Sequence, residues 1–491
     1  MIHSSRCRAH TRPTLPGCRK VAARHGRVHA MPRPALLRYV GLAGSLFLAA
    51  AAWLGGASSP WEPTVTPRTI LAGTDGVLLP VCWLLGTVLL IGAWWFGRLV
   101  VPSTRWAYVT AALWAVPLLP FLPLGSYDAY SYACQGWQLA AGLDPYGGGV
   151  DLLGCPWREA VAPTWLESPA PYGPVFLVLA AAAAKIGGSL TGTLVALRII
   201  AVLGVLLMAV CLPVLAKRSG VPPRRAVWLV LACPLVLIHL VSGAHNDAVM
   251  FGFLLAGLVI APRRMWAAGL LLGLAVGVKA TAIVVVPFVV LLAAPRLWRA
   301  AAEVAAGLVA ALAAVSVASG LGLGWVTGLT GSGISVQWTS PPTAVGMTVA
   351  LFGWDAVPAA RIVGIVALAV VLVVLWLRAR PAPLRYAGYA LAATVVLAPV
   401  FHPWYAIWPL AVLAATLPRD TKWLVAPVAV ASALCLPDGY NLALAVKTQG
   451  AVLMTAFVIY LAGKAIHEAK NRDPRRAGAA HAPDRLSRPD A

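Results

Sequence analysis

Long apolar stretches divide the chain into segments that are able to cross a membrane. A transmembrane helix needs about 20 mostly apolar residues to cross roughly 30 Å of hydrocarbon. Windows of this size lie at 36–55, 77–97, 106–124, 194–216, 303–324 and 357–377. We predict a membrane-spanning helix in each of these windows.

Shorter apolar runs fill much of the remaining sequence, and one or two polar residues separate each run from the next. We interpret these runs as short or tilted membrane helices. They lie at 227–243, 246–261, 265–278, 280–294, 386–400, 403–417, 423–437 and 448–463. Together, the long and short runs predict an all-α polytopic membrane protein with about 14 transmembrane helices, within a range of about 13 to 15.

Basic residues test this count, because Lys and Arg concentrate in the short cytoplasmic loops of membrane proteins. Fourteen spans place both termini and every basic loop on the cytoplasmic side. Those loops carry Arg98, Arg105, Lys217, Arg218, Arg224, Arg225, Arg263, Arg264, Arg296, Arg299, Arg378, Arg380, Arg385, Arg419 and Lys422. A further span at 174–188 would invert every later loop, so we predict a re-entrant or interfacial segment there.

The pattern divides the chain into a basic cytoplasmic tail at 1–35, a transmembrane domain at 36–463 and a second cytoplasmic tail at 464–491. Both tails are expected to be solvated. No cleavage-type segment follows the first tail, so no signal peptide is expected. Met1 and Met31 remain alternative start residues.

Composition supports the membrane assignment. Only 11% of the residues are charged, compared with about 25% in soluble domains, and the mean hydropathy is +0.81. The net charge of +22 does not form the basic, aromatic-rich face of a nucleic-acid-binding protein, so we expect membrane lipids and no nucleic acid as partners.

Most acidic residues fall on the predicted outer side, chiefly in the large loop at 125–193, so the chemistry is expected to face the exterior of the plasma membrane. Asp128 begins this loop, and a helix starting there would carry Tyr127 and Tyr130 at the interface, where aromatic rings are favoured. Asp128 alternatively caps that helix. Cys134 and Cys155 share the loop, either as a disulfide or as two free thiols.

Two Pro-containing motifs follow in the same loop. Asp144-Pro145-Tyr146 predicts a turn in which the Asp side chain bonds its own backbone. The rigid segment around Tyr172 is suited to form the wall of a pocket.

Polar residues inside the short apolar runs indicate a site, because such groups are costly at membrane depth unless they face a cavity or one another. The motif His245-Asn246-Asp247 is the clearest case, and His402 with Trp404 forms another outer turn. Lys279 interrupts a long apolar stretch and needs an anionic partner, such as a phosphate. Arg198 and Lys185 could join Lys279 in one anion-binding cluster, or the two lysines could extend to the interface.

Nothing in the sequence specifies a metal, because the His and Asp candidates lack ligand spacing. We predict no cofactor, and the alternative is a divalent metal bound by His245, Asp247, His402 and Asp128. Phosphate-cradling nucleotide motifs are also missing from the sequence. A reaction on the outer face therefore needs a donor that is delivered by the membrane itself, which indicates a lipid-linked substrate.

The chain resembles the GT-C glycosyltransferases that use polyprenyl-phosphate sugars, and within them the actinobacterial α-1,6-mannosyltransferases of the MptB type. The resemblance spans roughly residues 36–463. The motifs that carry it are Ser126–Gly136, Gly142–Tyr146, Pro171–Pro174, Gly243–Asp247, Gly277–Thr281 and His402–Tyr405.

This resemblance implies an inverting hexosyltransferase that moves mannose from polyprenyl-phosphate-mannose to a lipid-anchored α-1,6-mannan, as in lipomannan and lipoarabinomannan synthesis. Asp128 matches the usual base, and Lys279, with Arg198 and Lys185, would bind the donor phosphate. The residues expected to contact the sugar or the acceptor are His245, Asn246, Asp247, Tyr127, Tyr130, Asp144, Tyr146, Tyr172, His402 and Trp404. The alternatives are a related transferase for another polyprenyl-phosphate sugar, such as arabinofuranose, and a polytopic transporter or lipid flippase.

Overall fold

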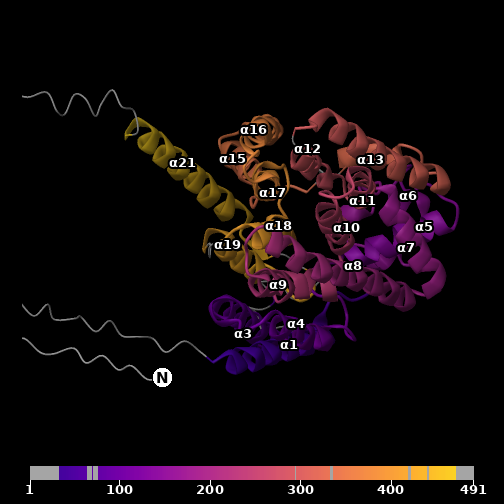
Figure 1. Ribbon diagram of the computed structural model, residues 1–491. Coiled ribbons are helices and arrows are strands. Elements are labelled where there is room, and N and C mark those ends of the chain that lie inside the picture. The colour runs from indigo at the N-terminus through magenta and orange to yellow at the C-terminus, as the bar shows by residue number, and fades with distance from the viewer. Residues whose placement is uncertain are drawn as a thin grey trace, which may run out of the picture.

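A computed structural model describes residues 33–62, 69, 76–293, 295–331, 335–418, 422–439 and 442–471. Its elements are helices, as the sequence predicts (Figure 1). Most of the two predicted tails, 1–32 and 472–491, lies outside the described residues. The last described helix, α21 (Lys447–Asn471), continues past the predicted domain end at 463.

Six helices of the described residues are long and apolar enough to cross a membrane. A seventh span results if α9 (Pro223–Leu231) and η4 (Val236–Ser242), which meet at a bend of 67°, count as one. These findings confirm a polytopic all-helical protein. The six helices are α1 (Pro34–Gly55), α3 (Leu78–Val100), α8 (Leu190–Arg218), α13 (Leu297–Ser319), α16 (Val357–Arg378) and α21.

One long window was predicted wrongly as a single span. In place of a helix over 106–124, the structure has α4 (Thr104–Ala115) followed by the single turn η1 (Val116–Leu118). The physical reason is proline, which lacks the backbone N–H and clashes with the preceding turn. Pro117, Pro120 and Pro123 recur at three-residue intervals and end the helix.

The short run 448–463 was predicted wrongly, because it forms part of the 25-residue helix α21, whereas the other short apolar runs form helices of 15 residues or fewer. Fourteen residues extend only about 21 Å, which is less than the hydrocarbon thickness. The described helices alone therefore do not establish 14 spans. These elements are α10 (Asp247–Ile260), α11 (Met265–Val278), η5 (Ala280–Val285), α12 (Val286–Val290), η6 (Leu291–Ala293), α17 (Pro383–Leu397), η7 (Pro403–Ala406), α18 (Ile407–Thr416) and α19 (Lys422–Ala433).

The centre of the molecule is formed by α8, α10, α11 and α18, and the other helices surround them (Figure 1). On one side, α1, α3 and α4 form a layer, and hydrogen bonds from indole N–H groups join this layer to α9. Trp94 donates from its Nε1 to the carbonyl oxygen of Leu229 at 3.2 Å, and Trp228 donates to the carbonyl oxygen of Trp94 at 3.0 Å. Further short helices complete the described chain: α14 (Gly324–Gly331), α15 (Pro341–Ala350) and α20 (Leu442–Ala445).

The large loop that follows η1 packs against this centre. It contains α5 (Asp128–Ala140), α6 (Val150–Leu153), η2 (Arg158–Ala160), η3 (Pro163–Trp165) and α7 (Pro174–Gly187). Gly173 lets α7 start directly beside the end of α11, because a Cβ at this position would lie 2.3 Å from the carbonyl oxygen of Gly277. This close approach brings the loop next to Lys279.

Candidate active site

The turn before α5 delivers Asp128 to the interior of the protein. Gly125 has a φ of +74°, which L side chains rarely adopt, and its N–H donates to the carbonyl oxygen of Pro437 at 3.3 Å. A Cβ at Gly125 would also lie 2.9 Å from the ring of His239. The glycine therefore serves both the turn and the close packing beneath it.

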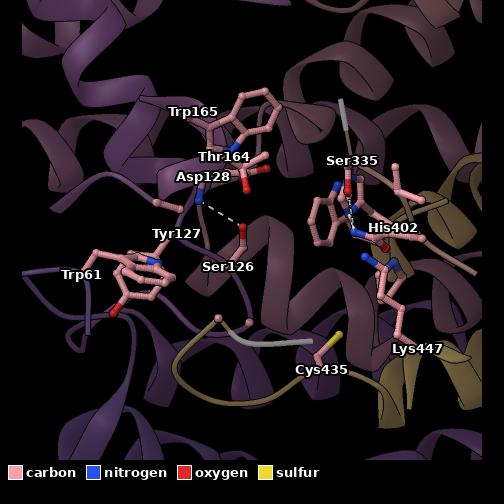
Figure 2. Close-up of a pocket in the computed structure, with 17 residues that line it drawn as sticks. Trp61, Ser126, Tyr127, Asp128, Thr164, Trp165, Ser335, His402, Cys435 and Lys447 are labelled. Atoms are coloured by element: carbon pink, nitrogen blue, oxygen red, sulfur yellow. Dashed lines mark hydrogen bonds between the residues drawn. The ribbon is translucent and has the colours of Figure 1, made fainter. Parts of the chain in front are cut away.

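Asp128 is almost fully buried, yet its carboxylate faces a cavity (Figure 2). Its Oδ1 accepts a hydrogen bond from Trp165 Nε1 at 3.3 Å. Its own backbone N–H donates to Ser126 Oγ at 3.0 Å. The helix-capping alternative is not what the structure shows, because the carboxylate bonds an indole from another segment rather than the first turn of α5.

Burial also changes the proton affinity of this carboxyl group. Removal of the charged form from water raises the pKa of Asp128 to about 6, against the opposing effects of the Lys279 ammonium and the Trp165 hydrogen bond. A carboxylate with a pKa in this range is a stronger base than an exposed one and is still ionised at pH 7.

The segment before α10 has an unusual backbone. Its element η4 is a π-helix, a form that is rare and frequent at functional sites. Ala244 follows with a φ of 52°, and among the described residues it alone has a positive φ without being glycine. This conformation costs an alanine about 1 kcal/mol. The strained turn places His245, whose N–H donates to the carbonyl oxygen of His239 at 3.1 Å.

His245 lies between two carboxylates. Its Nδ1 is 3.7 Å from Asp128 Oδ2 and 4.0 Å from Asp247 Oδ2. The ring is fully buried, and neither nitrogen has a hydrogen-bond partner; the neighbouring Asn246 amide is also buried without a partner. The predicted role of both residues as direct contacts of the sugar therefore has no exposed surface to support it.

Asp247 and Lys279 form a buried ion pair at the end of α11. Lys279 Nζ lies 3.1 and 3.0 Å from the two carboxylate oxygens of Asp247, and Trp408 Nε1 donates to Oδ1 at 2.7 Å. The ammonium also lies over the rings of Tyr405 and Trp408, at 4.7 and 5.2 Å from their centroids. Asp247 thus holds Lys279 in place rather than pointing freely into the cavity.

Two cavities meet at Asp128. The first, of about 470 Å³, extends from Asp128 and Tyr127 to Lys447 on the opposite wall (Figure 2). The second, of about 260 Å³, extends from Asp128 to Lys279 between η5 and α17. The residues shared by both walls are Asp128, Thr164, Trp165, Ser335, His402 and Trp404.

The rings of His402 and Trp404 lie against each other at this junction, and the buried Trp404 also packs against His239 and His245. The His402 and Trp404 rings are stacked at 4.5 Å with an interplanar angle of 6°. Gln337 lies 3.2 Å from His402 Nδ1 and fixes the imidazole. An aromatic wall of this kind is suited to pack against the apolar side of a sugar ring, and contact of His402 and Trp404 with a sugar stays a prediction.

The predicted cluster of three cations does not form. The Arg198 guanidinium donates to the carbonyl oxygens of Ser242, at 2.7 and 3.1 Å, and of Leu119, at 2.6 Å. Arg198 therefore satisfies backbone acceptors where helices end. Lys185 is exposed and lines a separate cavity with Trp137 and Trp157. Only Lys279 remains beside Asp128.

The remaining predicted contacts divide between wall and scaffold. Tyr127 and Tyr172 line the first and the second cavity, respectively. Tyr130 donates to the carbonyl oxygen of Ala57 at 2.5 Å, away from both cavities. Asp144 accepts from the N–H of Tyr146 at 2.9 Å, which is the predicted turn, and the Tyr146 hydroxyl donates to the carbonyl oxygen of Tyr172 at 2.8 Å.

Sequence reasoning missed several residues of the site. Trp165 holds Asp128, but it lies in a loop without periodicity. Trp408 could have been found, because it follows Trp404 by one helical turn and would share its face. His239 contacts Cys435, with 3.0 Å between Nε2 and Sγ. It was missed because it lies within an apolar run of the sequence. Gln337 gave no sequence signal.

Cys134 and Cys155 form a disulfide, one of the two alternatives left open by the sequence. The bridge ties α5 to the segment that leads to Trp165. Within the described residues, no group of three or more His, Cys, Asp or Glu side chains is arranged to hold a metal ion. Lys279 supplies a positive charge to the second cavity, and Lys447 supplies one to the first.

Comparisons with known proteins identify the family of the chain. A family model described as alpha-(1->6)-mannopyranosyltransferase, N-terminal domain, matches residues 38–295, and one described as MptB C-terminal domain matches residues 342–463. Alpha-(1->6)-mannopyranosyltransferase A of Mycobacterium tuberculosis is 32% identical over 416 residues, or 76% of this chain and 79% of that protein.

Alpha-(1->6)-mannopyranosyltransferase B of Corynebacterium glutamicum is 38% identical over 158 residues, which are 31% of this chain and 26% of that protein. No solved structure gives a significant match. The extent of the first match and the two family models together show that the chain belongs to the alpha-(1->6)-mannopyranosyltransferase family and is a hexosyltransferase.

Proposed function

We propose that the protein transfers mannose from polyprenyl-phosphate-mannose to a lipid-anchored α-1,6-mannan on the outer face of the plasma membrane, as in lipomannan and lipoarabinomannan synthesis. The single observation that carries this proposal is the junction of two cavities at one buried carboxylate. A transferase with two substrates needs such a junction, because the attacking hydroxyl and the bond that breaks must meet at the base.

The second cavity is suited to the donor. Lys279 supplies an ammonium beside Asp128, and two of its N–H groups reach Asp247 while its remaining N–H is available to a phosphate oxygen. Apolar residues at the ends of η5 and α17, including Ala280, Ala398 and Val400, line the same cavity and suit a polyprenyl chain.

The first cavity is suited to the acceptor. Polar side chains that can bond sugar hydroxyls line it, among them Ser126, Thr164 and Gln337. The half-buried ring of His402, stacked on Trp404, lies at its inner end. An acceptor sugar in this cavity would present its 6-hydroxyl to Asp128.

The reaction then proceeds in one step. Asp128 takes the proton of the acceptor hydroxyl as that oxygen bonds to the anomeric carbon of mannose. The bond from this carbon to the phosphate oxygen breaks, and its electrons stay on the phosphate, where Lys279 stabilises the added charge. Attack opposite to a β-linked phosphate gives an α-mannoside with inversion. Because Lys279 already supplies a cation, we expect activity to persist in the presence of EDTA.

The orientation of the site follows from the loop charges. If α4 with η1 completes one crossing and the short helices are tilted or broken as in α9 and η4, fourteen crossings would place Asp128, Lys279 and His402 at the outer face and the basic loops inside. Labelling of single introduced cysteines at Arg264 and Glu159 with an impermeant thiol reagent tests this orientation. Only the second position should react in intact cells.

The activity is tested with the purified protein in nanodiscs, radiolabelled polyprenyl-phosphate-mannose and a short α-1,6-mannoside, followed by digestion with a linkage-specific mannosidase. We expect Asp128→Asn to lower transfer roughly 10²- to 10⁴-fold, because the amide cannot accept the proton. Asp151→Asn is the matched control, since this exposed carboxylate bonds only Arg158 in the outer loop.

Three results would contradict the proposal. Full activity of Asp128→Asn would remove Asp128 as the base. Transfer by the wild type from polyprenyl-phosphate-arabinofuranose but not from the mannose donor would change the sugar, and inactivity with every lipid-linked sugar would favour a transporter.

A further inference from the structure

We propose that His245 is a positioning residue for Asp128 and not a contact of the sugar. The inference rests on the proposed function, since it concerns the base of that reaction. Three independent observations carry it: the place of the imidazole between two carboxylates, its lack of any other polar partner, and the strained backbone that puts it there.

The place of the imidazole is specific. Nδ1 is the nitrogen nearest to both carboxylates, at 3.7 Å from Asp128 and 4.0 Å from Asp247. Both distances exceed a hydrogen bond by less than 1 Å. Catalytic hydrogen bonds are often long in structures without substrate and shorten when the substrate binds. A small rotation of the Asp128 carboxyl group is enough to bring Oδ2 within reach of an Nδ1–H.

Burial excludes direct recognition of a sugar. The His245 side chain has no exposed surface, and the rings of Trp404 and His239 lie against it, with centroids at 4.7 and 5.1 Å. Buried polar groups are almost always hydrogen-bonded, so an imidazole with two unpaired nitrogens needs an explanation. A donor held ready for Asp128 supplies one.

The backbone indicates that this position is maintained at a cost. The turn from η4 to α10 contains a π-helix and then Ala244 with its φ of 52°. Strained conformations persist where the surrounding structure determines them, and they are concentrated at active sites. Here the turn ends in His245 and Asp247, whose side chains face Asp128 and Lys279, respectively.

The two oxygens of Asp128 would then have separate neighbours. Trp165 donates to Oδ1 from the outer loop. His245 would donate to Oδ2 from the opposite side. Held from both sides, the carboxylate stays ionised and directed toward the acceptor hydroxyl. Loss of the second donor would both misorient the base and raise its pKa, because a hydrogen bond to the charged form stabilises that form.

Substitutions at this position can separate the two nitrogens. His245→Asn keeps an N–H donor near the place of Nδ1, His245→Gln keeps one near Nε2, and His245→Phe keeps the ring volume without a donor. We expect Asn to retain activity within about tenfold of the wild type. Gln and Phe should lower kcat roughly 10- to 100-fold, while KM for the acceptor changes less than about twofold.

The pH profile gives a readout that a purely structural role would not move. In the Gln and Phe variants the acid limb of kcat, which reports the enzyme with substrate bound, should shift upward by about one pH unit, and in the Asn variant it should stay in place. His467→Asn, the same change at an exposed histidine of α21, is the matched control. The other titratable groups around Asp128 and His245 are unchanged in these variants: Asp247, Lys279, His239, His402, Tyr132, Tyr172, Tyr405 and Cys435.

The possible failures are distinguishable. If the wild type transfers no mannose, the proposed function fails before His245 is tested. If the wild type is active but Asn is no better than Gln, or the acid limb is the same in all variants, the positioning role is wrong. A selective rise in KM for the acceptor would instead indicate direct sugar contact. Thermal unfolding identifies any variant that fails to fold. If His245→Phe does not fold, the comparison of His245→Asn with His245→Gln still tests the positioning role.

Discussion

Helices α16 and α10 are both apolar, but they face different surroundings. Of the 22 residues of α16, only Gly364 is buried, whereas ten of the 14 residues of α10 are buried. The first helix exposes branched apolar side chains to lipid, and the second is enclosed by α8, α11 and α18. Hydropathy does not distinguish the two helices. Only α10 contributes a polar residue, Asp247 at its first position, to the candidate active site.

This difference shows where a membrane protein can keep charge. A carboxylate on the surface of α16 would face hydrocarbon without a partner, at a cost of several kcal/mol. At the start of α10, Asp247 has the Lys279 ammonium and the Trp408 indole within hydrogen-bond distance. Short helices enclosed by protein therefore carry the chemistry, and long helices facing lipid enclose it.

Truncation of a large side chain tests the comparison most strongly. Phe251→Ala on α10 should lower the free energy of unfolding by about 3 kcal/mol, because the fully buried ring leaves a cavity. Val363→Ala on α16 should change it by less than about 0.5 kcal/mol, since lipid fills the space of a side chain that is 68% exposed. Unfolding by heat in detergent measures both. Equal losses would contradict the distinction.

Removal of one partner from the buried ion pair should have a similar or slightly smaller effect. Asp247→Ala leaves the Lys279 ammonium without its anion, which we expect to cost about 3 kcal/mol of stability. The double variant Asp247→Ala and Lys279→Met removes both charges and should recover most of that loss, yet stay inactive. If the double variant were as unstable as the single one, the loss of stability would not come from the unpaired Lys279 charge.

The smallest effect is on proton affinity. Because burial raises the pKa of Asp128 to about 6, kcat/KM should fall about tenfold for each pH unit below that value. The sign follows from the mechanism, in which only the ionised carboxylate accepts a proton. A carboxylate facing water would keep full activity down to about pH 4. Initial rates at limiting acceptor between pH 4.5 and 8 distinguish the two environments.

The helices and most of the site could be predicted from the sequence for the same reason. Polar residues are so costly among apolar ones that Asp128, Asp247 and Lys279 stand out, and the structure does bring these three together. The break after α4 was also present in the sequence, as three prolines whose effect on a continuous helix was underestimated.

Hydropathy could not predict that the cation cluster fails to form. Hydropathy gives the depth of a residue but not the direction of its side chain. The Arg198 side chain turns toward backbone carbonyls where η1 and η4 end. The position of Trp165 could not be predicted either, because it depends on how a loop without periodicity folds back over α5.

The junction of the two cavities has a consequence for inhibitor design. Because both cavities share the wall formed by Asp128 and Trp165, one molecule could occupy them together. A compound that links a phosphonate for Lys279 to a mannose-like ring for the first cavity would bind its second half at a high effective concentration. Its affinity would then exceed that of either half alone, and no natural single substrate would match its shape.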